Sequence, residues 1–237
     1  MAVATKSGIY NGYKVIGTQT LGLRGLVLWL KFNEGSGNIA YDSSFYNNHG
    51  TIYGATWTDG KFGKALSFDG VDDYVEVPHS SKYYEVPLTI CGWVRGSGFD
   101  EDWRVIAHIG DYPLYKLNFA WNIRVNIGER ALNFYTCDDS GFDGVGIPLE
   151  ENELAFFCFV HDGSMAYAYK NEEFVKQKNI PAPKPVAQNL FIGIDSELSN
   201  PWKGMIDEVR IYNRALSENE RKMLYYNRIG AVPSKII

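Results

Sequence analysis

The chain has 237 residues, a formal net charge of −5, and 45% hydrophobic, 15% aromatic and 22% charged residues. A chain of this length can bury a large core without disulfides, and its acidic balance argues against nucleic acid as the main partner, because phosphate binding needs a basic surface. No apolar run reaches the ~18 residues of a membrane helix, so we expect no membrane insertion.

The first segment, residues 1–24, contains Lys6, Lys14 and Arg24 but no acidic residue. We expect it to form an extended N-terminal arm, with residues 25–237 forming the main domain. A disordered tail is the alternative. We find no signal-peptide pattern in the first thirty residues. An arm of this kind could lie along a neighbouring subunit, which makes a homo-oligomer or a larger assembly one of the expected states.

Short runs of strand-forming residues follow the arm, with turn signals such as Asp-Gly at 59–60 and 69–70 and His-Asp-Gly-Ser at 161–164 between them. About a dozen short strands at this spacing predict an all-β fold, a two-sheet antiparallel sandwich. The predicted strands cover 26–32, 65–68, 73–77, 88–94, 103–109, 114–121, 123–127, 131–136, 154–160, 165–170, 189–194 and 205–212.

A short C-terminal helix is predicted within residues 217–228. Ser217 and Glu220 form the S-x-x-E pattern of a capping box, and Gly230 and Pro233 would end the helix. We expect this helix to pack against the edge of the sandwich. Before it, the Pro-rich stretch 181–186 is too stiff for a central strand and is predicted to be a connector.

Cys91, Cys137 and Cys158 are far apart in the sequence, and an odd number of cysteines is no disulfide framework. We expect them to be free thiols, most of them buried. The four histidines show no metal-ligand spacing.

Patterns typical of catalysis are missing. A glycoside hydrolase of sandwich type needs two carboxylates on one strand face, as in E-x-D-x-E, and the sequence has no such triplet. Asp195 and Glu197 are the best candidate pair, but Ser and Pro around them predict a loop. The G-x-S-x-G motif is also missing. We therefore expect no enzyme activity and name no catalytic residue.

Acidic residues gather after the strand at 65–68. Asp69, Asp72 and Asp73 place three carboxylates within five positions, where they repel each other unless they are solvated or bound to a cation. A hard cation such as Ca²⁺ takes about six to eight oxygen ligands, so this loop is a candidate cation site.

Two specific blocks, 26–78 and 204–220, carry the motifs F-x-E-G-S-G, N-N-H-G, G-K-A-L-x-F-D-G and I-D-E-V-R-I-Y-N-R-A-L-S. With residues 156–174, the chain closely resembles the laminin-G-like members of the concanavalin A-like lectin/glucanase superfamily over about residues 26–228. The resemblance implies a jelly roll of two curved antiparallel sheets. It also implies a non-catalytic adhesion or carbohydrate-binding module, often with a structural calcium ion.

The resemblance further implies that calcium is held by early loops and by the strand matching residues 205–212. Carried onto this sequence, the implied ligands are Asp42, Asp69 and Asp207, with Asn48 as a weaker candidate. The alternative is that these Asp residues cap turns by accepting hydrogen bonds from backbone N–H groups.

Sugars stack their apolar faces on aromatic rings, while polar side chains bind the hydroxyl groups. The candidate ligand-binding residues are Trp103, Tyr115, Trp121, Arg124 and Tyr135. Aromatic residues on alternating strands are also typical of a core, and we assign Trp29 and Trp93 to the core.

The expected function is therefore binding to a glycan or a protein surface. An alternative is a structural virion component, used in capsid decoration or as a tail protein. A weaker alternative is a glycoside hydrolase or lyase. The expected location is extracellular or on a virion surface.

Overall fold

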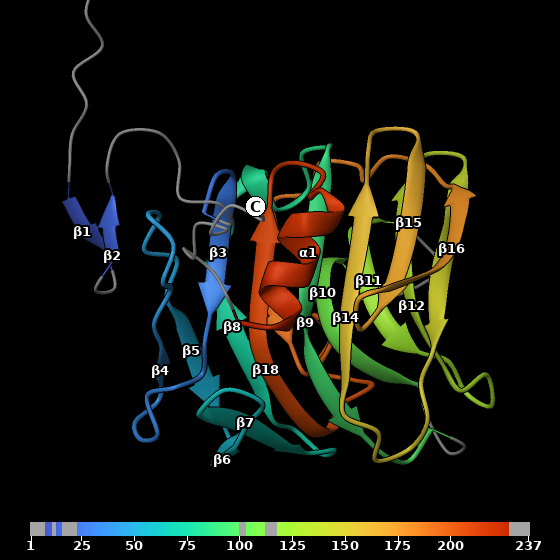
Figure 1. Cartoon of the computed structure of the whole chain (residues 1–237). Coiled ribbons are helices and arrows are strands. Elements are labelled where there is room, and N and C mark those ends of the chain that lie inside the picture. Colours follow the sequence, from blue (N-terminus) through green and yellow to red (C-terminus); the bar gives the residue numbers. More distant parts are fainter. Residues whose placement is uncertain (1–7, 11–12, 16–22, 100–102, 112–117, 228–237) are drawn as a thin grey trace, which may run out of the picture.

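The computed structural model describes residues 8–10, 13–15, 23–99, 103–111 and 118–227. These residues form two antiparallel sheets that pack face to face, with one short α-helix (Figure 1). The predicted all-β sandwich with a short C-terminal helix is confirmed. None of the helices in the described part of the chain is long and apolar enough to cross a membrane.

Sheet I has eight strands in the order β13-β12-β11-β10-β17-β8-β5-β4. Every neighbouring pair in it is antiparallel. Its strands are β4 (Ile39–Ala40), β5 (Gly50–Tyr53), β8 (Tyr74–Val77), β10 (Arg104–Asp111), β11 (Asn118–Val125), β12 (Ala131–Asp138), β13 (Gly141–Pro148) and β17 (Leu190–Ile192).

Sheet II runs in the order β16-β15-β14-β9-β18-β7-β6, and β3 also pairs with β18. Its strands are β3 (Leu26–Leu30), β6 (Thr56–Asp59), β7 (Lys64–Asp69), β9 (Leu88–Gly96), β14 (Ala155–His161), β15 (Met165–Lys170), β16 (Glu173–Asn179) and β18 (Lys203–Tyr212). The 3-10 turn η1 (Ser81–Tyr83) precedes β9.

The main core lies between the two sheets. Sheet II contributes Leu66, Val94 and Phe157, and sheet I contributes Ile123 and Phe134, all of them almost fully buried. Burying this apolar surface is the main favourable contribution to folding.

A second apolar cluster lies on the outer face of sheet II, beneath the helix α1 (Glu218–Tyr225). It is made up of Leu26, Trp29, Cys91, Trp93, Phe156, Cys158, Val160, Tyr212, Leu216 and Leu224. Because both faces of β14 are covered, all seven of its residues are buried. This explains why its sequence is apolar throughout instead of alternating.

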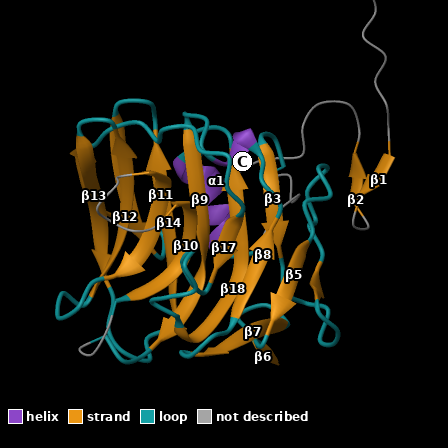
Figure 2. Cartoon of the chain, turned by 180° about the vertical axis from the view of Figure 1, so that it is seen from behind, coloured by secondary structure: helices purple, strands orange, loops and turns teal. Residues whose placement is uncertain are grey.

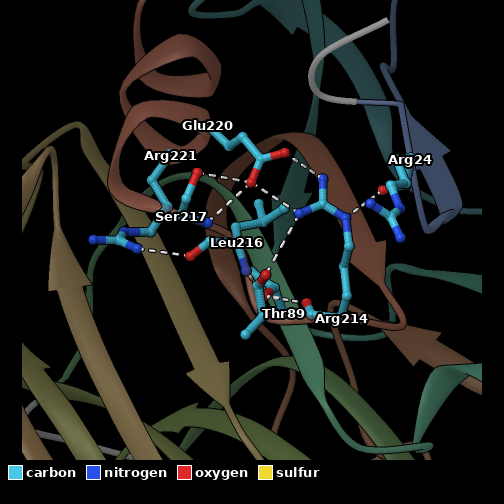
Figure 3. A network of polar contacts seen from close by, with 8 residues as sticks. Arg24, Thr89, Arg214, Leu216, Ser217, Glu220 and Arg221 are labelled. Carbon is cyan, nitrogen blue, oxygen red and sulfur yellow. Dashed lines mark hydrogen bonds and ion pairs between the residues drawn. The ribbon is translucent and has the colours of Figure 1, made fainter. Parts of the chain in front are cut away.

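Polar contacts fix α1 on sheet II (Figure 3). The Arg214 guanidinium donates to both carboxylate oxygens of Glu220, at 2.8 and 2.6 Å, and to the Arg24 carbonyl at 2.6 Å. Glu220 also accepts from the Ser217 N–H at 3.0 Å, as in the predicted capping box. Thr89 on β9 donates to the Arg214 carbonyl at 2.7 Å. The helix therefore begins at a point tied to the sheet.

Two short strands, β1 (Gly8–Tyr10) and β2 (Tyr13–Val15), pair with each other and belong to neither large sheet. The rest of the predicted arm up to residue 22 lies outside the described residues, as do Gly230 and Pro233. The division into an arm (1–24) and a domain (25–237) stays a prediction.

The structure has strands that the sequence analysis did not predict. β13 contains three glycines and ends in proline, and β16 is exposed along all seven residues. Both lie at an edge of their sheet, where a strand has only one neighbour and needs little apolar character. The predicted runs 114–121 and 123–127 contribute to one described strand, β11.

Candidate functional site

Polar and aromatic side chains line the outer face of sheet I over β10, β11 and β12. In Figure 2 this face is turned toward the viewer, and α1 lies behind the strands. Ile123 and Val125 point into the main core, so the intervening Asn122 and Arg124 point outward. The ladder places His108 opposite Asn122, and Asn122 opposite Tyr135. One row of outward side chains therefore crosses three strands.

Three aromatic side chains, Trp103, Tyr135 and Phe142, form what we call the aromatic platform. The Arg124 guanidinium lies 3.9 Å from the ring centre of Trp103 and 4.8 Å from that of Tyr135. The rings of Tyr135 and Phe142 meet edge to face, with centres 5.8 Å apart. Arg124 is buried, whereas Trp103 and Tyr135 are half-buried and Phe142 is 44% exposed. Rings fixed by a cation in this way present a rigid apolar surface.

A buried polar layer supports the platform. The Asn122 amide donates to His108 Nδ1 at 3.0 Å, and His108 Nε2–H donates to the Gly110 carbonyl at 3.1 Å. Burial lowers the pKa of His108 to about 4, so the imidazole is neutral at pH 7. Asn126 donates to the Tyr135 hydroxyl at 2.6 Å and fixes the orientation of that ring.

Two oxygen atoms in this layer have no hydrogen-bond donor. Within the described residues, Oδ1 of Asn122 and Oδ1 of Asn126 are buried and accept no hydrogen bond. Buried polar atoms without a partner are uncommon in folded proteins. Asn122 and Asn126 thus each leave one buried hydrogen-bond acceptor unused on this face of sheet I.

A hollow of about 370 Å³ adjoins the platform at the β12–β13 hairpin, and Phe142 belongs to both. Polar groups dominate its lining. The lining residues are Asp138, Ser140, Gly141, Phe142, Asp143, Asn179, Ile180 and Pro181.

The structure brings together three of the five predicted ligand-binding residues: Trp103, Arg124 and Tyr135. Tyr115 lies outside the described residues. Trp121 is fully buried in the main core, and its indole N–H donates to the Tyr83 carbonyl at 2.7 Å. Assigning Trp121 to a ligand surface was therefore wrong, and its alternative as a core residue is correct.

The register of β11 explains why Trp121 does not share a face with Phe119. The β10–β11 ladder shifts between Ile109 and Gly110, so Trp121 pairs with Ile109 while Phe119 pairs with Gly110. The Trp121 ring contacts Phe134 in the core, whereas the Phe119 ring contacts His108 and Phe142. A bulge reverses the alternation of side chains, and strict alternation cannot predict it.

The predicted calcium ligands do not surround a common point. Asp42 accepts the N–H groups of Trp29, Ser44 and Asn48 at 2.8–2.9 Å, and the Ser44 hydroxyl at 2.6 Å. Its oxygens are thus used to brace the 42–48 loop against β3. Asn48 takes part through its backbone N–H and donates its amide to the Val27 carbonyl at 3.3 Å. Asp42 therefore fits the turn-capping alternative, and Asn48 supplies one of the N–H groups that it accepts.

Asp207 is fully buried on β18, and its Oδ2 accepts the N–H groups of Lys61 and Phe62 at 2.7 and 3.4 Å. Its Oδ1 accepts no hydrogen bond among the described residues. Burial, and then the neighbouring Glu208 carboxylate, raises the pKa of Asp207 to about 7. Asp207 therefore holds the turn between β6 and β7 and does not meet Asp42 or Asp69.

Asp69 lies instead with Asp72 and Asp73, in a group whose ligand oxygens are all within 4.8 Å of one another. Asp69 and Asp72 are exposed, and Asp73 accepts the Asp69 N–H at 2.8 Å. Burial, with added repulsion from Asp69 and Asp72, raises the pKa of Asp73. Hard oxygen donors under mutual repulsion fit a divalent cation.

The best hydrolase candidate of the sequence analysis, Asp195 with Glu197, does not form a pair of facing carboxylates. Asp195 is fully buried and accepts hydrogen bonds from the Glu197 N–H, from the N–H and hydroxyl of Ser199, and from the Asn200 amide. Its carboxylate thus organises the 195–200 loop.

Phe142, Gly144 and the hollow at the β12–β13 hairpin were not predicted from the sequence. Gly144 and Gly146 lie opposite Tyr135 and Asn133 on β12. The spacing of these two glycines was the available signal, because alternate glycines on a strand leave room for the side chains of a neighbouring strand.

Comparison with known proteins identifies related folds. A sequence profile of the concanavalin A-like lectin/glucanases superfamily matches residues 69–220. No curated protein sequence matches the chain.

The following solved structures share the fold and are distant in sequence. The binding domain of Paraclostridial Mosquitocidal Protein 1 has a TM-score of 0.68 at 17% identity, over 86% of this chain and 52% of that one. The ligand binding domain of botulinum neurotoxin serotype D, in complex with N-acetylneuraminic acid, has a TM-score of 0.67 at 12% identity, over 86% and 51%. This chain thus spans about half the length of those toxin domains.

Domain 4 of AbnA, an extracellular arabinanase from Geobacillus stearothermophilus, was solved in complex with arabinotriose. It matches with a TM-score of 0.65 at 19% identity, over 84% of this chain and 98% of that domain. At this level of identity the likeness shows a common fold.

Proposed function

Since the chain belongs to the concanavalin A-like lectin/glucanases superfamily, we propose that it is a non-catalytic carbohydrate-binding module whose ligand lies on the aromatic platform. The observation that carries this proposal is the pair of half-buried rings, Trp103 and Tyr135, which both pack against the buried Arg124 guanidinium. A sugar ring would stack its C–H face on this surface and extend toward the hollow beside Phe142.

The polar groups of the site suit hydroxyl recognition. The hollow offers carboxylate oxygens of Asp138 and Asp143, and amide groups of Asn179, next to the aromatic surface. Sites with few placed polar groups beside aromatic side chains are typical of small-ligand recognition. Because His108 is neutral at pH 7, the layer beneath the rings contributes orientation instead of an added charge.

Distant structural neighbours support the ligand class. One was solved with arabinotriose and another with N-acetylneuraminic acid. A fold hosts many functions, so these complexes suggest sugars without naming the one that this chain binds.

We propose a site without catalytic activity because the carboxylates near the platform already have structural partners. Glu129 accepts the amides of Asn126 and Asn133 at 2.8 and 3.2 Å, and Asp143 pairs with Lys178 at 2.6 Å. Glycoside hydrolysis needs one carboxyl group free to give a proton and a second free to attack or to activate water.

Calcium remains part of the proposal, at a changed position. The residues that fit a Ca²⁺ ion are Asp69, Asp72 and Asp73, where an ion would offset the mutual repulsion of the carboxylates and hold the turn between β7 and β8. Asp42 and Asp207 do not belong to this set.

We also propose an extracellular location, because the structural neighbours include the binding domain of a toxin and a domain of an extracellular arabinanase. The virion alternative and assembly through the N-terminal arm stay predictions. Measuring the molar mass of the full chain, and of a chain beginning at residue 25, would test self-association. A monomer in both cases would exclude assembly through the arm.

A glycan array with the full chain tests the proposed function. We expect binding to a limited set of glycans and its loss in Tyr135→Ala. Leu154→Ala is the control, because Leu154 is 37% exposed and does not belong to the platform. Absence of binding to every glycan, with calcium present, would refute the carbohydrate-binding role.

A further inference from the structure

We propose that the groove between β15, β16 and α1, on the outer face of sheet II, is a second carbohydrate site and takes an uncharged sugar residue. The groove has a volume of about 450 Å³ and is lined by Tyr167, Tyr169, Glu172, Phe174, Gln177, Glu218 and Arg221. It lies on the opposite side of the sandwich from the aromatic platform.

The groove exists because α1 covers only part of sheet II. Figure 1 shows the helix in front of β18 and β9, with β15 and β16 uncovered beside it. Tyr167 pairs with Gln177 across the two strands, and Tyr169 pairs with Phe174. Since Ala166 and Ala168 face the main core, Tyr167 and Tyr169 face outward.

Of the two neighbouring rings at the base of the groove, Tyr169 is held in place and Phe174 is exposed. The Arg221 guanidinium lies 3.7 Å from the ring centre of Tyr169 and donates to the Leu216 carbonyl at 2.8 Å, so it is held by the start of α1 (Figure 3). The Tyr169 ring meets Phe174 edge to face at 5.7 Å. Phe174 itself is 56% exposed, which leaves a large ring available for stacking.

The polar lining favours hydroxyl groups over charged ligands. Glu172, Glu218 and Gln177 supply oxygen acceptors, and Arg221 and Gln177 supply donors. The Glu172 and Glu218 carboxylates are balanced by Arg221 and by Lys222, which pairs with Glu218 at 2.7 Å, so the groove has no excess cation to hold an acidic sugar. An uncharged sugar needs no such cation and would stack on Phe174 and exchange hydrogen bonds with these groups.

This proposal rests on the chemistry of the groove and is independent of the platform. The two sites share no residue, because the platform residues lie just before β10 and on β12 and β13, and the groove lies between β15, β16 and α1. A chain with two glycan sites on opposite faces could bridge two sugar chains and gain avidity from a multivalent surface.

Amide chemical shifts of the ¹⁵N-labelled full chain test this inference, with arabinotriose and cellotriose as uncharged probes and trigalacturonate as the charged one. We expect saturable shifts at Phe174 and Gln177 with an uncharged probe at millimolar concentration, and binding at least several-fold weaker for trigalacturonate. Phe174→Ala should weaken this binding by about 5- to 10-fold through lost ring contact. Val175→Ala is the matched control, because Val175 is exposed on the same strand and does not line the groove.

The outcomes separate the two sites. Shifts at Asn122 and Tyr135 but not at Phe174 and Gln177 would overturn the second site and leave the platform supported. Shifts in the groove that persist in Phe174→Ala, or tighter binding of trigalacturonate, would also overturn it. No shift at either place with any probe would count against both sites.

Discussion

Gly144 lies directly opposite Tyr135 in the β12–β13 ladder, and a β-carbon at Gly144 would come 2.5 Å from a ring carbon of Tyr135. The Tyr135 ring therefore covers the space that a side chain on β13 would fill. The position of one platform ring thus depends on the absence of a side chain on the neighbouring edge strand.

Gly144→Ala should shift the Tyr135 ring and destabilise the fold by about 1–3 kcal/mol, the usual effect of overpacking. We expect glycan affinity to fall several-fold, as measured by titration calorimetry, with stability taken from urea unfolding. Gly146→Ala is a matched control, because a β-carbon there would meet Asn133 and not Tyr135. Equal affinity in Gly144→Ala and wild type would show that the position of Tyr135 does not matter for binding.

Asp207 should make stability fall as pH rises. Its folded pKa is about 7, well above the ordinary value of 3.8, so between about pH 4 and pH 7 the folded state binds more protons than the unfolded state. The free energy of unfolding should therefore decrease across that window and level off above it. Urea unfolding at a series of pH values measures this.

Asp207→Asn isolates that contribution, because an amide can accept the Lys61 N–H but does not titrate. The difference in unfolding free energy between variant and wild type should change in favour of the variant from pH 4 to pH 7, by roughly 1–4 kcal/mol. A difference that is independent of pH would contradict the raised pKa.

Glu220→Ala should loosen α1. The substitution removes both hydrogen bonds from Arg214 and the contact to Ser217, and breaking a largely buried ion pair costs about 3–5 kcal/mol. Because Leu224 on the helix and Cys91 and Cys158 on the sheet share one cluster, both thiols should react faster with a thiol reagent. Glu218→Ala, at an exposed helix position, is the control. Unchanged labelling rates would show that the ion pair does not hold the helix.

Calcium should raise the melting temperature, and chelation should lower it, if Asp69, Asp72 and Asp73 hold an ion. Binding to the folded state stabilises by about 2.7 kcal/mol at roughly a hundredfold excess over Kd. Asp72→Asn should remove most of the response, whereas Asp42→Asn should destabilise equally in calcium and in chelator, because Asp42 braces a loop. Identical melting temperatures for wild type in both buffers would exclude the ion.

The sequence patterns correctly predicted those features of the fold that depend on interactions between residues close together in the chain. The capping box of Ser217 and Glu220 is present at the start of α1, and the apolar run predicted at 154–160 forms β14 (155–161), which is covered on both faces. These features depend on neighbours in the sequence or on the simple separation of apolar from polar side chains.

Features that depend on distant strands could not be predicted in this way. The bulge that places Phe119 and Trp121 on opposite faces of β11 arises from the pairing of β10 with β11, and the Gly-rich β13 is a strand because β12 lies beside it. The aspartates were ambiguous for a similar reason. Asp207 accepts the Lys61 N–H from 146 positions away, which no local pattern contains.

Mapping the bound sugar on the chain tests the central claim most directly. Amide shifts of the ¹⁵N-labelled protein titrated with arabinotriose should change at Arg124, Tyr135 and Phe142 on the outer face of sheet I, and Tyr135→Ala should abolish the changes there. The amides of β7 and β18, far from the platform, should stay unchanged. Binding that leaves Arg124 and Tyr135 unshifted, or that survives in Tyr135→Ala, would contradict a carbohydrate site on the aromatic platform.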